Sequence, residues 1–272
     1  MLLQRLKTAS VLIVLLGIVL ALGGWVLGVA IMACICIALR EEFHALTVAG
    51  HRPIQWPTWV GMVASIPLVL IHSSKAIVPL LLFQCLLTII CVAFREKPKL
   101  EDSLMSIMPM LSVLLPGMCM LGMVMIENRA MQLSMLCLTF IIPVLGDTAA
   151  YFVGSRVGGP KLCPQVSPNK TISGAIGGLI GSIAASFLVG GVVALCAPGS
   201  WAILPTALEY LLIGLVGGVA GQMGDLFASM VKRHCNVKDF SGLFPGHGGM
   251  LDRLDSILFT AMVVFSYLIL KG

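Results

Sequence analysis

Apolar stretches long enough to cross a lipid bilayer recur along nearly the whole chain, from residue 10 to residue 270. Of the 272 residues, 58% are hydrophobic and only 11% are charged, whereas soluble domains average about 25% charged residues. This composition excludes a disordered chain, a disulfide scaffold, a coiled coil and an ordinary soluble domain. We therefore predict an all-α fold, a polytopic bundle of transmembrane helices that forms one integral membrane domain over residues 1–272.

Charged clusters or Gly and Pro residues separate the apolar stretches from one another. They predict about nine transmembrane helices, over residues 10–22, 25–39, 56–73, 76–94, 105–126, 130–153, 173–195, 202–230 and 253–270. Gly23 and Gly24 interrupt the first thirty apolar positions, which leaves a tight hairpin, one long tilted helix or a cleaved signal peptide as alternatives. The length of the apolar region argues against the signal peptide.

The distribution of Lys and Arg favours the hairpin and predicts the orientation. With nine spans and a cytoplasmic N-terminus, 14 of the 17 basic residues fall on the cytoplasmic side. A single span over residues 10–39 would place Arg5 and Lys7 opposite the other basic loops. The net charge of +5 is too modest to indicate a nucleic-acid partner. The nine Cys residues contain no CxxC pair, so we expect neither a disulfide framework nor a cysteine metal site.

Two segments, residues 147–170 and 225–255, carry polar groups that topology alone does not explain. An ionisable group at membrane depth costs about 2.5–3.5 kcal/mol, so Asp147 and Asp225 should be paired, metal-bound or in a wet cavity. Asp252 and Asp255 are three residues apart and share one helix face. Favourable contact with the helix dipole is the alternative explanation for this pair, but two carboxylates on one face favour Mg²⁺ binding. The remaining cytoplasmic loops, 40–52 and 95–102, are interpreted as topogenic charge.

Basic residues and glycines accompany these carboxylates. Lys170 precedes a helix, and three cations follow Asp225, namely Lys232, Arg233 and Lys238. Gly246, Gly248 and Gly249 would let backbone N–H groups approach a phosphate. Walker A and GxGxxG sequences are absent from the chain. Together these features predict phosphoryl or nucleotidyl transfer at a membrane face.

The same glycine pattern, GxxGGxxG, occurs in two spans, at residues 174–181 and 214–221. Small residues at this spacing let helix backbones approach closely, although such motifs are common in membrane helices. The first of these spans begins just after Lys170 and the second ends at Asp225. We therefore hypothesise that close packing of the two helices fixes Lys170 and Asp225 relative to each other.

Residues 229–255 resemble the C-terminal signature of the phosphatidate cytidylyltransferases, also called CDP-diacylglycerol synthases. The matching residues are Ser229, Lys232, Arg233, Lys238, Asp239, His247, Gly248, Gly249, Asp252, Arg253 and Asp255. Three further family motifs match at residues 147–151, 167–171 and 224–226. Ser173 and Ala228 stand where family members commonly have Glu. The resemblance covers most of the chain, with residues 1–126 mainly as scaffold and residues 130–272 carrying the motifs.

The resemblance implies transfer of CMP from CTP to phosphatidate, which gives CDP-diacylglycerol and pyrophosphate. The implied cofactor is Mg²⁺, with a second metal ion as an alternative. The implied partners are CTP, phosphatidate and the lipid bilayer, and a homodimer is left open. The implied location is the cell inner membrane, with the active site facing the cytoplasm.

The resemblance and the residue types together assign roles to particular positions. The expected metal ligands are Asp225, Asp252 and Asp255, with Asp147 as an additional candidate. The expected catalytic residues are Asp225, Asp252 and Lys170. The expected substrate-binding residues are Ser167, Lys232, Arg233, Lys238, His247, Gly248, Gly249 and Arg253. Three alternatives to this enzyme are a CTP-dependent lipid or polyprenol kinase, a transporter and a structural membrane subunit.

Overall fold

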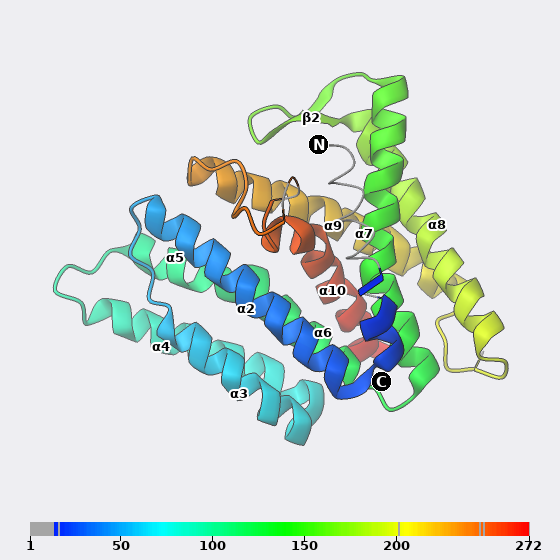
Figure 1. Cartoon of the computed structure of the whole chain (residues 1–272), viewed down its shortest axis with the longest axis horizontal. Coiled ribbons are helices and arrows are strands. Elements are labelled where there is room, and N and C mark those ends of the chain that lie inside the picture. The colour runs from blue at the N-terminus through cyan, green and yellow to red at the C-terminus, as the bar shows by residue number, and fades with distance from the viewer. Residues whose placement is uncertain (1–13, 16, 201, 245, 247, 272) are drawn as a thin grey trace. The chain divides into compact units, whose positions relative to one another are not determined.

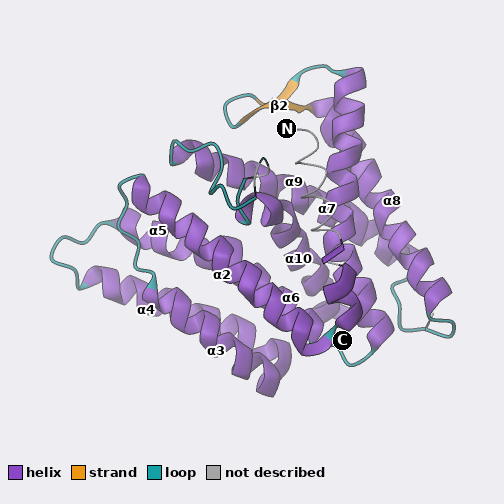
Figure 2. Cartoon of the chain, viewed as in Figure 1, coloured by secondary structure: helices purple, strands orange, loops and turns teal. Residues whose placement is uncertain are grey.

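A computed structural model describes residues 14–15, 17–200, 202–244, 246 and 248–271, and these residues are predominantly helical (Figures 1 and 2). The helices are α2 (Gly24–Val48), α3 (Trp56–His72), α4 (Ile77–Ala93), α5 (Leu100–Pro109), α6 (Leu115–Val124), α7 (Arg129–Val157), α8 (Ile172–Cys196), α9 (Ala207–His234) and α10 (Leu251–Lys271). The 3₁₀ turn η1 (Ser73–Ala76) joins α3 to α4, and the π-helical turn η2 (Met110–Leu114) joins α5 to α6. A short antiparallel hairpin consists of β1 (Lys161–Cys163) and β2 (Ser167–Thr171).

The predicted spans after the first overlap observed helices, but α2 extends to Val48, beyond the predicted end at residue 39, and α5, η2 and α6 together correspond to the predicted span 105–126. The count of nine transmembrane helices stays a prediction. Among the described residues, five helices are long and apolar enough to cross a membrane: Leu100–Val124, Arg129–Val157, Ile172–Cys196, Ala207–His234 and Leu251–Lys271. The helices α3 and α4 are shorter apolar helices of 17 residues each. Several apolar helices of this kind fit a multi-pass membrane protein. The β-hairpin was not predicted and is the one departure from the all-α expectation among the described residues.

The described residues test only part of the predicted transmembrane hairpin over residues 10–39. The first predicted span, residues 10–22, falls largely outside the described residues. Gly23 and Gly24 both have positive φ, at 61° and 51°, where an L side chain would be strained. The helix α2 therefore begins at the glycine pair where the sequence predicted an interruption.

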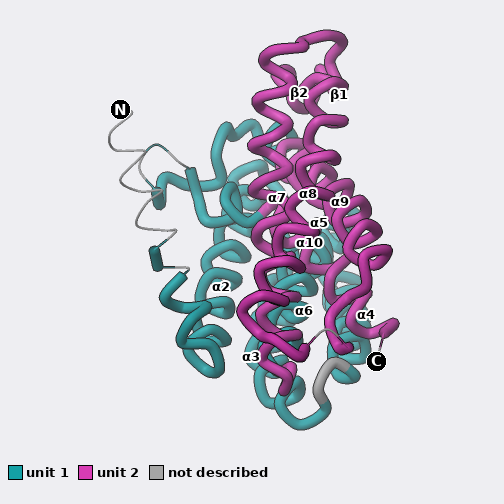
Figure 3. The backbone as a smooth tube through the Cα atoms, turned by 90° about the vertical axis from the view of Figure 1, so that its right-hand side faces the viewer, with its two compact units in different colours: residues 1–125, 232–254 teal, residues 126–231, 255–272 magenta. Residues whose placement is uncertain are grey.

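The described chain forms two compact units (Figure 3). Unit 1 comprises residues 1–125 and 232–254, and unit 2 comprises residues 126–231 and 255–272. The division passes through α9 and α10, so the C-terminal signature contributes to both units.

In unit 1, α2 packs along the helix that runs from α5 through α6. A Cβ atom at Gly117 would lie 2.6 Å from Ile35, so the glycine permits this close approach. Glu42 on α2 is buried and accepts hydrogen bonds from Ser112 Oγ at 3.1 and 3.0 Å. The described loops around residues 52 and 95 are joined by Asp102, which pairs with Arg95 at 3.3 Å.

In unit 2, glycines on α8 and α9 bring neighbouring helices together on two faces. On α8, added Cβ atoms at Gly177 and Gly181 would lie within 2.6 Å of Val153 and Ala149 of α7. On α9, an added Cβ at Gly218 would lie 2.6 Å from Ser182 Cβ of α8. The two glycine motifs therefore do not pack mainly on each other: the α8 motif faces α7 most closely, and α9 packs one turn further along α8.

Gly218→Leu is expected to abolish activity while the protein still inserts into the membrane, because the side chain would force α9 away from Ser182. Gly178→Leu should do the same, since an added Cβ there would lie 2.9 Å from Gln222 Nε2. Gly191→Leu is the matched control on α8, as nothing lies within 4 Å of its added Cβ. The measurement is enzyme activity per inserted protein. Full activity in Gly178→Leu and Gly218→Leu would contradict the hypothesis that this packing positions the site.

Candidate active site

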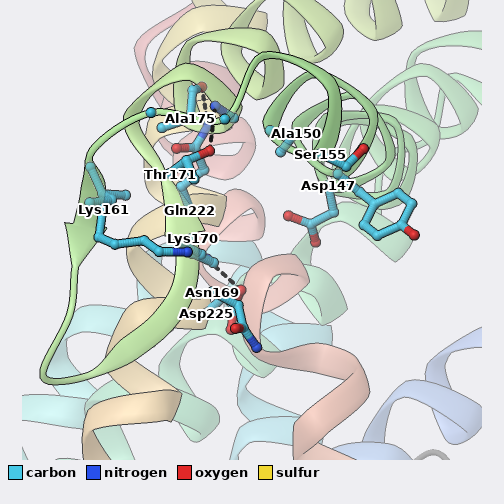
Figure 4. A pocket seen from close by; sticks show the side chains of 16 residues that line it. Asp147, Ala150, Ser155, Lys161, Asn169, Lys170, Thr171, Ala175, Gln222 and Asp225 are labelled. Atoms are coloured by element: carbon cyan, nitrogen blue, oxygen red, sulfur yellow. Dashed lines mark hydrogen bonds and ion pairs between the residues drawn. The ribbon is translucent and has the colours of Figure 1, made fainter.

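A cavity of about 900 Å³ lies within unit 2, where α7, the β-hairpin, α8 and α9 meet (Figure 4). Its polar lining includes Asp147 from α7, Lys170 from β2, and Gln222 and Asp225 from α9. Glycines and Ala residues form much of the remaining wall. The cavity is therefore large enough for a ligand and carries charges of both signs.

Lys170 and Asp225 form an ion pair across this cavity, with 2.5 Å between Lys170 Nζ and Asp225 Oδ2. Both side chains are about a quarter exposed, at 26% and 27%. Ser229 Oγ lies 3.5 Å from Asp225 Oδ1, one helical turn further along α9. The pair places Lys170 and Asp225 close together, as expected from the hypothesis that packing of the two glycine-rich helices fixes them relative to each other.

Asp147 lines the same cavity from α7, within electrostatic range of both Lys170 and Asp225. Figure 4 shows its carboxylate turned towards the side of the cavity that carries these two residues. Two carboxylates and two ammonium groups, those of Lys161 and Lys170, therefore line one cavity, as expected for a site that binds a cation, a phosphate or both.

The hairpin and the start of α8 set the position of Lys170. Thr171 follows it as the N-cap of α8, and Thr171 Oγ1 accepts a hydrogen bond from Gly174 N at 3.1 Å. Ser173 Oγ donates to the carbonyl oxygen of Gly158. Ser173 stands where the family commonly has Glu, and its hydroxyl ties the helix start to the end of α7. Ser167 begins β2 and is not among the described residues that line the cavity.

Gln222 is a cavity residue that sequence reasoning missed. Its Nε2 donates to the carbonyl oxygen of Ala175 on α8 at 3.0 Å, so it links α9 to α8 beside the cavity. It precedes Asp225 by three residues and therefore lies on the same face of α9. A lone amide at that spacing within an apolar helix was the available signal.

The carboxylate of Asp252 organises the signature loop within unit 1. Asp252 Oδ1 accepts from Lys232 Nζ at 2.6 Å, and Oδ2 accepts from the amides of Phe240 and Gly249, both at 2.9 Å. The side chains of Lys232 and Asp252 are only 15% and 3% exposed. Lys232 also lies over the Phe240 ring, 5.5 Å from its centroid. Asp252 thus holds both the loop and the lysine.

The other predicted residues of the signature occupy varied environments. Arg233, Lys238 and Arg253 are exposed. Gly248 has φ +79° and forms a bridge with Phe244, while His247 lies outside the described residues. Asp255 belongs to unit 2, in the first turns of α10, and accepts from Ser256 N at 2.7 Å. Because the Gly249 amide already donates to Asp252, the loop geometry gives Gly249 a structural role beside its predicted contact with substrate.

The donor chemistry of the unit 2 cavity suits Mg²⁺. Asp147 and Asp225 supply hard carboxylate oxygens, and Mg²⁺ commonly takes one or two carboxylates and completes its shell with water and substrate phosphates. No group of three or more His, Cys, Asp or Glu side chains that could hold a metal ion occurs among the residues that the structure describes. A Mg²⁺ ion held by Asp147 and Asp225 would take its further ligands from water and substrate phosphates.

Comparison with known proteins identifies the family. Residues 3–270 match the cytidylyltransferase family. The phosphatidate cytidylyltransferase of Synechocystis sp. is 31% identical over 298 aligned positions, which cover 98% of this chain and 96% of the relative. Those of Brucella suis and Bacillus subtilis are each 44% identical over 121 and 125 residues. These two matches cover 44% and 46% of this chain, and each spans only 42% of the relative's length. The prediction from the signature residues is confirmed, and the chain belongs to the cytidylyltransferase family.

Proposed function

We propose that this protein transfers CMP from CTP to phosphatidate and releases pyrophosphate. The observation that carries the proposal is the cavity in which Lys170, Asp225 and Asp147 converge, in a chain of the cytidylyltransferase family. In this reaction a phosphate oxygen of the lipid attacks the α-phosphorus of CTP. The bond from the α-phosphorus to the oxygen bridging the α- and β-phosphates breaks, and pyrophosphate leaves. The product is CDP-diacylglycerol, an activated phospholipid precursor.

The main obstacle to this reaction is electrostatic, because an anion attacks a polyanion. The lipid phosphate is already ionised near neutral pH, so no strong general base is required. Lys170 would bind phosphate oxygens and stabilise the charge that develops on them in the transition state. Its present partner, Asp225, would orient the ammonium group. The predicted substrate-binding roles of Ser167, Lys232, Arg233, Lys238, His247, Gly248, Gly249 and Arg253 belong to the same proposal.

Mg²⁺ belongs to the proposal as cofactor, with Asp225 and Asp147 as the residues of the cavity that would hold it. Asp252 and Asp255 stay as predicted ligands from the signature. A bound Mg²⁺ would neutralise phosphate charge and orient the reacting oxygens. A second metal ion is the alternative stoichiometry.

The proposed location is the inner membrane, with the cavity open to the cytoplasm. The support is the distribution of Lys and Arg, which places 14 of 17 basic residues on one side when nine spans are drawn. The acyl chains of phosphatidate would stay in the bilayer while CTP arrives from the water. A basic face would also concentrate two anionic substrates.

Removal of divalent metal is expected to abolish CMP transfer reversibly. Without a metal, Asp147 and Asp225 would add negative charge to a site that must accept a nucleotide triphosphate. The measurement is transfer by the purified protein with excess EDTA, followed by addition of Mg²⁺ beyond the chelator. Full activity in EDTA would contradict the proposed role of Mg²⁺ as cofactor.

Pyrophosphate release provides a direct test of the proposed reaction. Purified protein in lipid is incubated with CTP and Mg²⁺, with and without phosphatidate. We expect pyrophosphate that appears only when both substrates are present. Phosphatidate-dependent formation of CDP without pyrophosphate would instead favour a CTP-dependent lipid kinase, and no reaction with either substrate would reopen the transporter and structural alternatives.

A further inference from the structure

Glu41 is a buried carboxylate that contacts the signature loop from the other end of the sequence. It lies on α2, in the charged segment interpreted from sequence as topogenic, yet it is only 7% exposed. Ser241 Oγ donates to Glu41 Oε1 at 2.5 Å and Met250 N donates to the same oxygen at 3.0 Å. Leu251 N donates to Oε2 at 2.8 Å. All four residues belong to unit 1.

These contacts supply what the start of α10 lacks. The first N–H groups of a helix have no partner within it and usually bond to a side-chain oxygen of a preceding residue. Gly248, Gly249 and Met250 precede α10, and none of them carries such an oxygen. Glu41 therefore satisfies the amides at this end in place of a local cap. A carboxylate is also the charge that a helix N-terminus stabilises.

The glycine pair of the signature makes room for two carboxylates. A Cβ atom at Gly249 would lie 2.6 Å from Glu41 Oε2, and one at Gly248 would lie 2.8 Å from Asp252 Oδ2. Gly248 also has φ +79°, which L side chains rarely adopt. Gly248 is therefore favoured by its backbone conformation, and a side chain at Gly249 would displace the carboxylate of Glu41.

The contacts of the two carboxylates alternate along the loop. Asp252 accepts from the amides of Phe240 and Gly249, and Glu41 accepts from the neighbouring Ser241 hydroxyl and Met250 amide. Each end of the loop is thus held twice. Releasing Glu41 would leave Asp252 to hold Lys232 and the loop alone.

We propose that Glu41 is a positioning residue for the reaction: it fixes the signature loop and the start of α10, and thereby the Lys232–Asp252 pair. This inference rests on the proposed function, in which that pair serves CMP transfer. It assigns to the N-terminal helices, otherwise scaffold, a residue on which the chemistry depends.

The first test compares Glu41→Ala and Glu41→Gln with Glu42→Gln. Glu42 is the adjacent residue, is buried at 1% exposed, and its carboxylate accepts hydrogen bonds from Ser112. Because small misplacements of catalytic groups can cost about 10²-fold, Glu41→Ala should lower kcat by about that factor, with a smaller change in KM for CTP. Glu41→Gln keeps one acceptor oxygen and should fall between wild type and Glu41→Ala. Wild-type kcat in Glu41→Ala would overturn the proposal. A loss of kcat in Glu42→Gln equal to the loss in Glu41→Gln would also overturn it.

A second test follows the loop without using activity. Cys235 begins the loop and is 3% exposed, while Cys119 in α6 is 5% exposed and serves as an internal reference. Labelling by N-ethylmaleimide, quantified for each peptide by mass spectrometry, should rise at Cys235 but not at Cys119 in Glu41→Ala. Equal rises would indicate general unfolding, and no rise at Cys235 would show that Glu41 does not hold the loop; either result overturns the proposal.

A third test uses the clash at Gly249. Gly249→Ala should damage loop order in the wild type because its methyl group meets Glu41, but should add little damage in Glu41→Ala. Independent, additive effects on Cys235 labelling would contradict the contact. These labelling tests do not depend on turnover. If wild type transfers no CMP, the proposed function fails while the role of Glu41 in the loop is still decided.

Discussion

Lys170→Met is expected to lower CMP transfer by about 10²–10³-fold, the usual effect of removing one group that stabilises transition-state charge. Lys170 is the cation that directly contacts a carboxylate of the unit 2 cavity, at 2.5 Å from Asp225. Met has a similar length and no charge, so the cavity walls should stay in place. The measurement is kcat/KM for CTP and for phosphatidate with purified protein.

Lys271→Met is the matched control. Lys271 also pairs with a carboxylate in unit 2, Glu209 at 3.1 Å, but neither residue lines the cavity. Its loss should change activity less than threefold, because partly exposed ion pairs contribute little to stability. Equal effects of the two substitutions would mean that Lys170 acts only through general stability, which contradicts its proposed role.

Asp252→Asn is expected to lower the turnover rate by at least about 10²-fold. An Asn side chain offers one acceptor oxygen where the structure uses two, for Lys232 and for the amides of Phe240 and Gly249. It also leaves the ammonium group of Lys232 without its charged partner. Breaking a buried pair in this way costs about 3–5 kcal/mol, so activity is measured per correctly inserted protein.

Asp102→Asn separates this effect from the loss of any buried acid in unit 1. Asp102 is 6% exposed, pairs with Arg95 at 3.3 Å and accepts from the amide of Arg52, and both of these partners lie outside the signature loop. Its substitution should lower thermal stability more than kcat. Near wild-type kcat in Asp252→Asn would contradict the assignment of Asp252 to the chemistry.

The sequence predicted several of the apolar helices well because one physical constraint dominates them. A span must be apolar over enough residues to cross the bilayer, so charges and glycines mark its ends directly. The predicted span 173–195 and the observed α8 at Ile172–Cys196 agree within one residue. The β-hairpin of β1 and β2 was missed because its strands have only three and five residues, and Pro168 lies inside β2.

Some polar residues were predicted from the sequence and others were missed, and the difference is how far along the chain their partners lie. Asp147, Lys170 and Asp225 were singled out because each is a charge within an apolar span or directly beside one. Glu41 was missed because its partners lie 200 to 210 residues away and its neighbours look like ordinary loop charge. Local sequence patterns show that burying a charged group is unfavourable. Only the fold shows which partners stabilise that group after burial.

Transfer of CMP from CTP to phosphatidate is tested most directly by following the α- and γ-phosphates of CTP. Purified protein is incubated with phosphatidate, Mg²⁺ and CTP labelled either on the α-phosphorus or on the γ-phosphorus, and the lipid fraction is counted. We expect the α-label to enter the lipid as CDP-diacylglycerol and the γ-label to leave in pyrophosphate. Entry of γ-label alone, or of neither label, would contradict this expectation.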